Sequence, residues 1–167
     1  AVVCGNPVKK AEISALIREK VPNTKLMLIG PVHDNGELEK LIAERNLREQ
    51  VMLLGWRDDV PALLHSSDIY VASSKSEGLG LNLIEAMACD LPVVASRNRG
   101  HAETVDHGTN GFLVEVNDSR AMAEKVLLLH GDDELRQRIA RQAHADIEKY
   151  EKEATLTELC ELVSQHA

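Results

Sequence analysis

Short apolar runs alternate with helical patterns over most of the chain. The runs that predict β-strands are Val2–Cys4, Lys25–Ile29, Val51–Leu54, Asp68–Ala72, Pro92–Ala95 and Gly111–Val114. Between them, apolar residues at helical spacing predict helices over 12–20, 37–47, 60–65 and 81–89. This alternation is typical of a parallel sheet covered by helices on both faces. We therefore expect an α/β domain with a doubly wound parallel sheet of about six strands, whose function lies at the carboxyl ends of the strands.

Beyond Val116 the pattern predicts helices only. Asp118 is the expected N-cap of a helix over 119–130, with Gly131 as its stop, and Asp132 or Asp133 is the expected cap of the next helix. A last helix is predicted over 154–165. Its apolar positions are Leu156, Leu159, Cys160 and Val163. This stripe must be covered either by the domain's own sheet or by another domain.

Composition excludes several classes of function. The chain has 167 residues, enough for one domain with its own core. Its net charge is −8 and only 2% of its residues are aromatic, so neither a basic surface nor stacking platforms for nucleic acid are present. The three cysteines are far apart, which favours free thiols in a reducing compartment and predicts a cytoplasmic protein. No apolar run approaches the ~20 residues of a membrane span.

The stretch from 73 to 95 carries the candidate chemistry. It reads as a strand end, a turn with Gly78 and Gly80, a helix and the next strand, and two glutamates, Glu77 and Glu85, flank the glycines. Glycines admit a close approach of backbone N–H groups to an anion, and a helix start adds unpaired N–H groups and a positive dipole end. A diphosphate fits such a turn. Two helical turns rise only ~11 Å, so the two carboxylates can hydrogen-bond hydroxyls on either side of it.

The segment EGLGLNLIE resembles the Glu-x7-Glu signature of the retaining glycosyltransferases of family 4, also called glycosyl transferases group 1. The preceding GWRDDVPALLHSSDIYVASSKSEGLG and the following EAMACDLPVVAS and ETVDHGTNGFLVEVND are similar to the family's flanking sequences. The resemblance implies a Rossmann-like fold that forms one half of a two-domain GT-B enzyme. It implies that residues 1–167 are the C-terminal, donor-binding half and that the N-terminal acceptor domain is absent.

The function that this resemblance implies is transfer of a sugar from a nucleotide-sugar donor to an acceptor, with retention of the anomeric configuration. The enzyme would be a hexosyltransferase of carbohydrate biosynthesis that needs no cofactor or bound metal. Its sugar, lipid or protein acceptor would bind through the absent domain, the full-length enzyme would associate peripherally with a membrane, and the isolated domain would be inactive. The alternatives are a non-catalytic nucleotide-binding or interaction domain and a GT-B sugar-nucleotide epimerase.

The resemblance also implies roles for individual residues. Glu77 is the implied catalytic residue, and the implied donor-binding residues are Glu85, Gly78, Leu79, Gly80, Leu81, Asn82, Lys10, Gly30, Gly55 and Trp56. The chain departs from the family at Asn6, where the family has an arginine that holds the diphosphate. The family's lysine corresponds to Lys9 or Lys10, and Lys10 is favoured because it borders the predicted helix start.

Several of these residues have simpler interpretations. Gly30 suits an ordinary turn, and Trp56 suits a cap on the core. Asp58 or Asp59 is expected to cap the helix over 60–65 rather than to bind a metal. Glu103 matches an acidic family position, and it equally suits a carboxylate at a helix start. The histidines lack metal-binding spacing and are expected at the surface or in the core.

Overall fold

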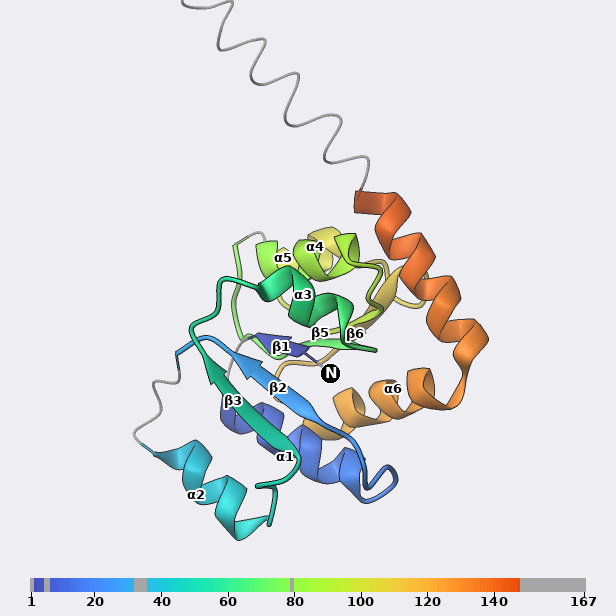
Figure 1. Cartoon of the computed structure of the whole chain (residues 1–167). Coiled ribbons are helices and arrows are strands. Elements are labelled where there is room, and N and C mark those ends of the chain that lie inside the picture. Colours follow the sequence, from blue (N-terminus) through green and yellow to red (C-terminus); the bar gives the residue numbers. More distant parts are fainter. Residues whose placement is uncertain (1, 5–6, 32–35, 79, 148–167) are drawn as a thin grey trace, which may run out of the picture.

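The computed structural model describes residues 2–4, 7–31, 36–78 and 80–147 (Figure 1). Its centre is a six-stranded sheet with the order β3-β2-β1-β4-β5-β6, and every pairing between neighbouring strands is parallel. The strands are β1 (Val2–Cys4), β2 (Leu26–Ile29), β3 (Val51–Gly55), β4 (Tyr70–Ala72), β5 (Val93–Ser96) and β6 (Gly111–Val114). The six predicted strands and the doubly wound α/β fold are confirmed.

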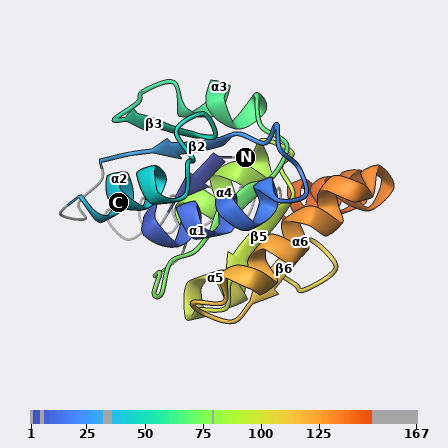
Figure 2. The same cartoon turned by 90° about the horizontal axis from the view of Figure 1, so that it is seen from below.

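Helices cover both faces of the sheet (Figures 1 and 2). One layer holds α1 (Pro7–Arg18), α2 (Glu37–Glu44) and α6 (Ser119–Gly131), and the other holds α3 (Val60–His65), α4 (Leu81–Ala88) and α5 (Arg99–Thr104). Each layer has its own apolar core. Ile13, Leu38 and Leu129 belong to the first core. Leu83 and Met87 belong to the second, which a further helix over 133–147 completes.

The structure differs from the predicted helices in two places. The first helix begins at Pro7 rather than at residue 12, because proline suits the first helical position, where no N–H partner is needed. As a result Lys10 lies inside the helix and not at its border. The helix α5 was not predicted at all, since Arg99–Thr104 shows no apolar periodicity and contains Gly100. The predicted helix over 154–165 lies outside the described residues.

The predicted caps have mixed outcomes. Asp118 accepts a hydrogen bond from the N–H of Ala121 at 2.9 Å, and Asp132 accepts one from Leu135 at 2.9 Å, so both of these caps are confirmed. Asp59 occupies the N-cap position of α3 without a capping hydrogen bond from its side chain. Instead its carboxylate accepts two hydrogen bonds from the guanidinium of Arg57, at 2.7 and 2.5 Å. These bonds lower the pKa of Asp59 and raise that of Arg57.

A carboxylate joins the starts of α1 and α6. Glu12 accepts hydrogen bonds from Nζ of Lys9 and from Oγ of Ser119, both at 2.9 Å. Burial acts to raise the pKa of Glu12, but these two bonds outweigh it and the pKa lies below its ordinary value. The ionised carboxylate therefore holds Lys9 near the carboxyl ends of the central strands.

Two further expectations concern membranes and cysteines. In the part of the chain that the structure describes, none of the helices combines the length and the apolar character needed to cross a bilayer. Cys89 is a free, half-buried thiol. Burial, followed by the negative charges of Asp90 and Glu85, raises its pKa, so the thiol form predominates as expected for a structural cysteine.

Candidate functional site: the glycine turn

The glycine turn, defined as residues 73–78 with Gly80, connects β4 to α4. Gly80 is the N-cap residue of α4 and has φ 63°, a left-handed conformation that favours glycine. Its carbonyl accepts the N–H of Leu83 at 2.8 Å, which starts the helix. The turn lies where the strand order reverses, because β1 continues into α1 on one face of the sheet and β4 continues into α4 on the other. In open α/β sheets, ligands bind at this switch point.

The helix α5 packs against this turn and supports it. A Cβ on Gly100 would lie 2.7 Å from the carbonyl oxygens of both Glu77 and Gly78, so only glycine fits there. The two carbonyls therefore point toward α5. In a planar trans peptide the N–H lies opposite the carbonyl, so the N–H of Gly78 points away from α5. The turn is thus held in a shape that presents backbone N–H to an anion.

Two polar side chains at and just after the end of β5 hold the turn against the sheet. Oγ of Ser96 and Nδ2 of Asn98 both donate hydrogen bonds to the carbonyl of Ser74, the second at 3.0 Å. Oδ1 of Asn98 also accepts the N–H of His101 at 3.0 Å, which caps α5. Sequence reasoning missed Ser96, Asn98, Gly100 and His101. The asparagine one residue before α5 was the available signal, because asparagine is a favoured N-cap.

The two glutamates flank the glycine turn as predicted. Glu77 is half-buried and precedes α4, whereas Glu85 is exposed and lies about one turn into the helix. Of the other predicted residues, Gly78 is exposed and Leu81 is 64% exposed. Oδ1 of Asn82 accepts the N–H of Leu83 at 3.0 Å. Leu79 lies outside the described residues.

Gly30 and Gly55 meet at the same edge of the sheet. The N–H of Gly30 donates to the carbonyl of Gly55 at 2.7 Å, and both residues have positive φ, 103° and 61°. Among the residues that the structure describes, no atom lies within 4 Å of the position that a Cβ would take on either glycine, so the space beside them is open. Trp56 follows directly and is 84% exposed. The interpretation of Trp56 as a cap on the core is therefore wrong, and its ring is available to a ligand.

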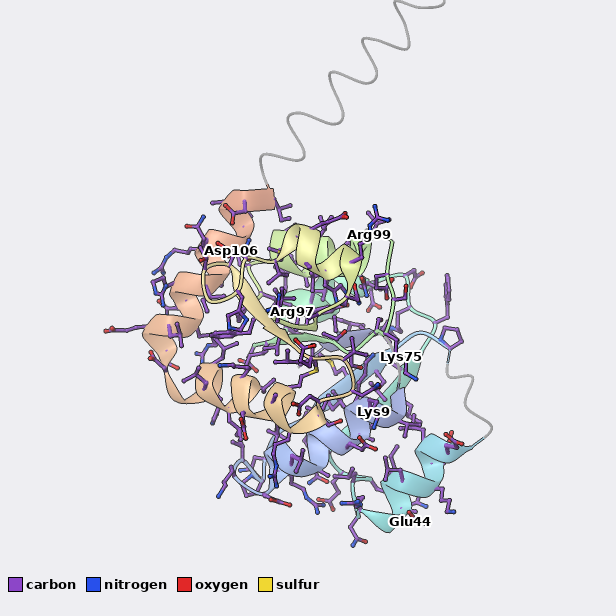
Figure 3. All side chains as sticks on the ribbon, turned by 180° about the vertical axis from the view of Figure 1, so that it is seen from behind. Lys9, Glu44, Lys75, Arg97, Arg99 and Asp106 are labelled. Atoms are coloured by element: carbon purple, nitrogen blue, oxygen red, sulfur yellow. The ribbon has the colours of Figure 1, made fainter. Side chains whose placement is uncertain are left out.

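Positive charge gathers near the turn, although not on Lys10. The side chain of Lys10 is only 2% exposed and lines a small cavity with Ile13 and Leu26. Lys9, in contrast, borders a small hollow with Ser73 and Ser96, at the ends of β4 and β5. Lys75, Arg97 and Arg99 follow the same two strands (Figure 3).

The neighbouring acidic residues pair with these cations. Arg97 lies 3.4 Å from the carboxylate of Glu115, and Arg99 lies 3.2 Å from that of Glu103. Glu103 is near the end of α5, so its interpretation as a helix-start carboxylate is wrong. Among the described residues no cluster of three or more histidine, cysteine, aspartate or glutamate side chains could hold a metal ion.

The strand order and the position of the glycine turn define a Rossmann-like domain. The comparisons with known proteins agree. The sequence profile described as "Glycosyl transferases group 1" matches residues 8–146. The chain is 30% identical over 161 residues to EpsD of Bacillus subtilis (strain 168), covering 96% of this chain and 42% of EpsD. It is 33% identical over 125 residues to the N-acetyl-alpha-D-glucosaminyl L-malate synthase of Bacillus anthracis, covering 75% of this chain and 33% of that enzyme.

The chain also resembles solved structures. The C-terminal domain of a glycosyl transferase group 1 family protein (LpcC) from Francisella tularensis superposes with a TM-score of 0.81 and 26% identity, covering 89% of this chain and 83% of that one. Anabaena Alr3699/HepE in complex with UDP-glucose superposes with a TM-score of 0.79 and 30% identity, covering 89% and 44%. The chain therefore belongs to the glycosyl transferases group 1 family and forms one Rossmann-like half of a GT-B fold. It spans less than half the length of the two relatives named above.

Proposed function

We propose that this domain binds the nucleotide-sugar donor of a retaining glycosyltransferase. The observation that carries the proposal is the glycine turn at the switch point, where the N–H of Gly78 points away from α5 and α4 begins after Gly80. That arrangement suits a diphosphate. Family membership supports a sugar donor, and the structure of Alr3699/HepE with UDP-glucose supports a uridine nucleotide as the first ligand to test.

The proposed roles follow from position. Glu85 accepts hydrogen bonds from the vicinal hydroxyls of the ribose. Glu77, on the other side of the turn, accepts hydrogen bonds from hydroxyls of the sugar. Gly30, Gly55 and Trp56 lie beside open space at the neighbouring strand ends and are proposed to hold the base. We also propose that the residues from Leu79 to Asn82 contact the donor.

One proposed role moves from Lys10 to Lys9. The side chain of Lys10 is buried between α1 and the sheet, whereas Lys9 borders the hollow beside Ser73 and is held there by Glu12. As the bond between the sugar and the diphosphate breaks, negative charge grows on the leaving diphosphate. Lys9, the N–H of Gly78 and the dipole of α4 are placed to stabilise that charge.

The proposal predicts weak binding without turnover by the 167-residue chain. Calorimetric titration with UDP should give a dissociation constant of roughly tens of micromolar to millimolar, or about −6 to −4 kcal/mol. Weak affinity is expected because a GT-B cleft closes only between two domains. UDP-glucose should bind in the same range and remain intact. Absence of both heat and thermal stabilisation with UDP, GDP and ADP at about 10 mM would contradict the proposal.

A further inference from the structure

His101 is a fully buried polar residue directly under the glycine turn. Its side chain is 0% exposed. A Cβ on Gly80 would lie 3.3 Å from Cδ2 of His101 and 3.8 Å from its Nε2, so the imidazole fills the space that glycine leaves open. The neighbouring Gly100 contacts the turn at Glu77 and Gly78. Two consecutive residues of α5 thus support the turn at both of its glycines.

The hydrogen bonds of His101 define its tautomer. Nδ1 lies 2.8 Å from the carbonyl oxygen of Ser96, which can only accept a hydrogen bond. Nδ1 therefore carries a hydrogen. Nδ2 of Asn98 is 3.1 Å from the same Nδ1, but it donates instead to the carbonyl of Ser74. In the neutral ring, Nε2 is consequently a hydrogen-bond acceptor.

Nε2 of His101 has no hydrogen-bond partner among the described residues, although it is buried. An unsatisfied buried acceptor is destabilising, so such atoms are rare and often have a functional reason. The ring is fixed at its other nitrogen by β5, and Nε2 lies 3.8 Å from the position that a Cβ on Gly80 would take. The hydrogen-bond donor that a glycine offers is its main-chain N–H.

We propose that His101 is a positioning residue of the donor site, and that its Nε2 accepts the main-chain N–H of Gly80 when a diphosphate binds to the turn. This inference rests on the proposed function. In the unbound domain Nε2 has no hydrogen-bond partner among the described residues. When the anion binds, the turn packs against α5 and the N–H of Gly80 donates a hydrogen bond to Nε2. His101 does not touch the ligand. It fixes the turn in the shape that directs the N–H of Gly78 and the start of α4 toward the diphosphate.

The first test uses the wild-type chain labelled with ¹⁵N at histidine and titrated with UDP. We expect the Nδ1 signal of His101 to be that of a protonated nitrogen throughout. The Nε2 signal should be that of a bare acceptor without ligand and should shift as UDP saturates the site. An Nε2 signal that stays unchanged at saturation would overturn the proposal, and so would an Nδ1 that carries no hydrogen.

The second test compares three variants. Glutamine can place an acceptor oxygen at the position of Nε2, whereas asparagine reaches only the position of Nδ1, and phenylalanine fills the space without polar atoms. We expect His101→Gln to bind UDP within about threefold of wild type, and His101→Asn and His101→Phe to bind about tenfold more weakly, a difference of about 1.4 kcal/mol. A folded His101→Phe with wild-type affinity would show that the imidazole only fills space.

The outcomes separate the two proposals. If the wild-type chain binds none of the nucleoside diphosphates, the proposed function fails and the role of His101 fails with it. If the wild-type chain binds UDP while the Nε2 signal stays unchanged and the three variants bind equally, the function stands and only the role of His101 is rejected. Circular dichroism and thermal unfolding of each variant show whether it is folded.

Discussion

Replacing Glu85 by glutamine is expected to weaken UDP binding by about 10- to 100-fold. The change keeps the size of the side chain and removes the charge that makes its hydrogen bonds to the ribose hydroxyls strong, an effect of about 1.5–3 kcal/mol. Glu85 is exposed on α4, so the fold should be unaffected. Calorimetry on Glu85→Gln measures the loss. Glu124→Gln, an equally exposed position on α6, is the matched control and should bind UDP like the wild type.

The same titration on Glu77→Gln tests the division of roles between the two carboxylates. Glu77 is assigned to the sugar, so UDP should bind nearly as tightly as to the wild type, whereas sugar transfer by the full-length enzyme should fall. Equal losses of UDP affinity in Glu77→Gln and Glu85→Gln would reject the assignment. This comparison needs no acceptor, because free UDP contains the ribose and the diphosphate but no sugar.

Replacing Gly100 by alanine is expected both to destabilise the domain and to impair the site. The new Cβ would lie 2.7 Å from two backbone carbonyl oxygens, those of Glu77 and Gly78, and neither can rotate away as a flexible side chain would. Either α5 or the turn must move, and overpacking of this kind costs about 1–3 kcal/mol. Because the turn also carries the N–H of Gly78, UDP affinity should fall at least about tenfold.

Gly131→Ala provides the control for this experiment. Gly131 lies at the end of α6, and no atom of the described part of the chain lies within 4 Å of the position that an added Cβ would take. Its substitution should leave UDP binding unchanged and should change stability by less than about 1 kcal/mol. Thermal unfolding and calorimetry are measured on both variants. A Gly100→Ala protein with wild-type stability and affinity would show that α5 does not hold the turn.

The strands β4, β5 and β6 could be predicted from sequence because they are buried on both faces. Strands of a parallel sheet that helices cover on both faces have nearly continuous apolar runs, as Val93–Ser96 and Gly111–Val114 do. The caps at Asp118 and Asp132 were equally predictable, because they depend on side chains within a few residues of their partners. The glycine turn and its two glutamates could be predicted because glycines just before an apolar helix indicate a turn whose backbone N–H groups can approach an anion.

The features that the sequence did not predict depend on contacts between segments that are far apart in the chain. The helix α5 is held by its contact with residues 77 and 78 and by the Asn98 bonds to Ser74, and no local pattern encodes these. The burial of Lys10 followed from the early start of α1, which turned a residue expected at the helix border toward the sheet. The exposure of Trp56 reflects its place directly after the edge strand β3.

A crystal structure of the 167-residue chain with UDP tests the central claim most directly. The account predicts the diphosphate at the glycine turn, within hydrogen-bond distance of the N–H of Gly78 and near the start of α4. It predicts the ribose hydroxyls on the carboxylate of Glu85 and the base beside Gly55 and Trp56. UDP bound elsewhere on the domain, or a diphosphate at the turn with its ribose far from Glu85, would contradict it.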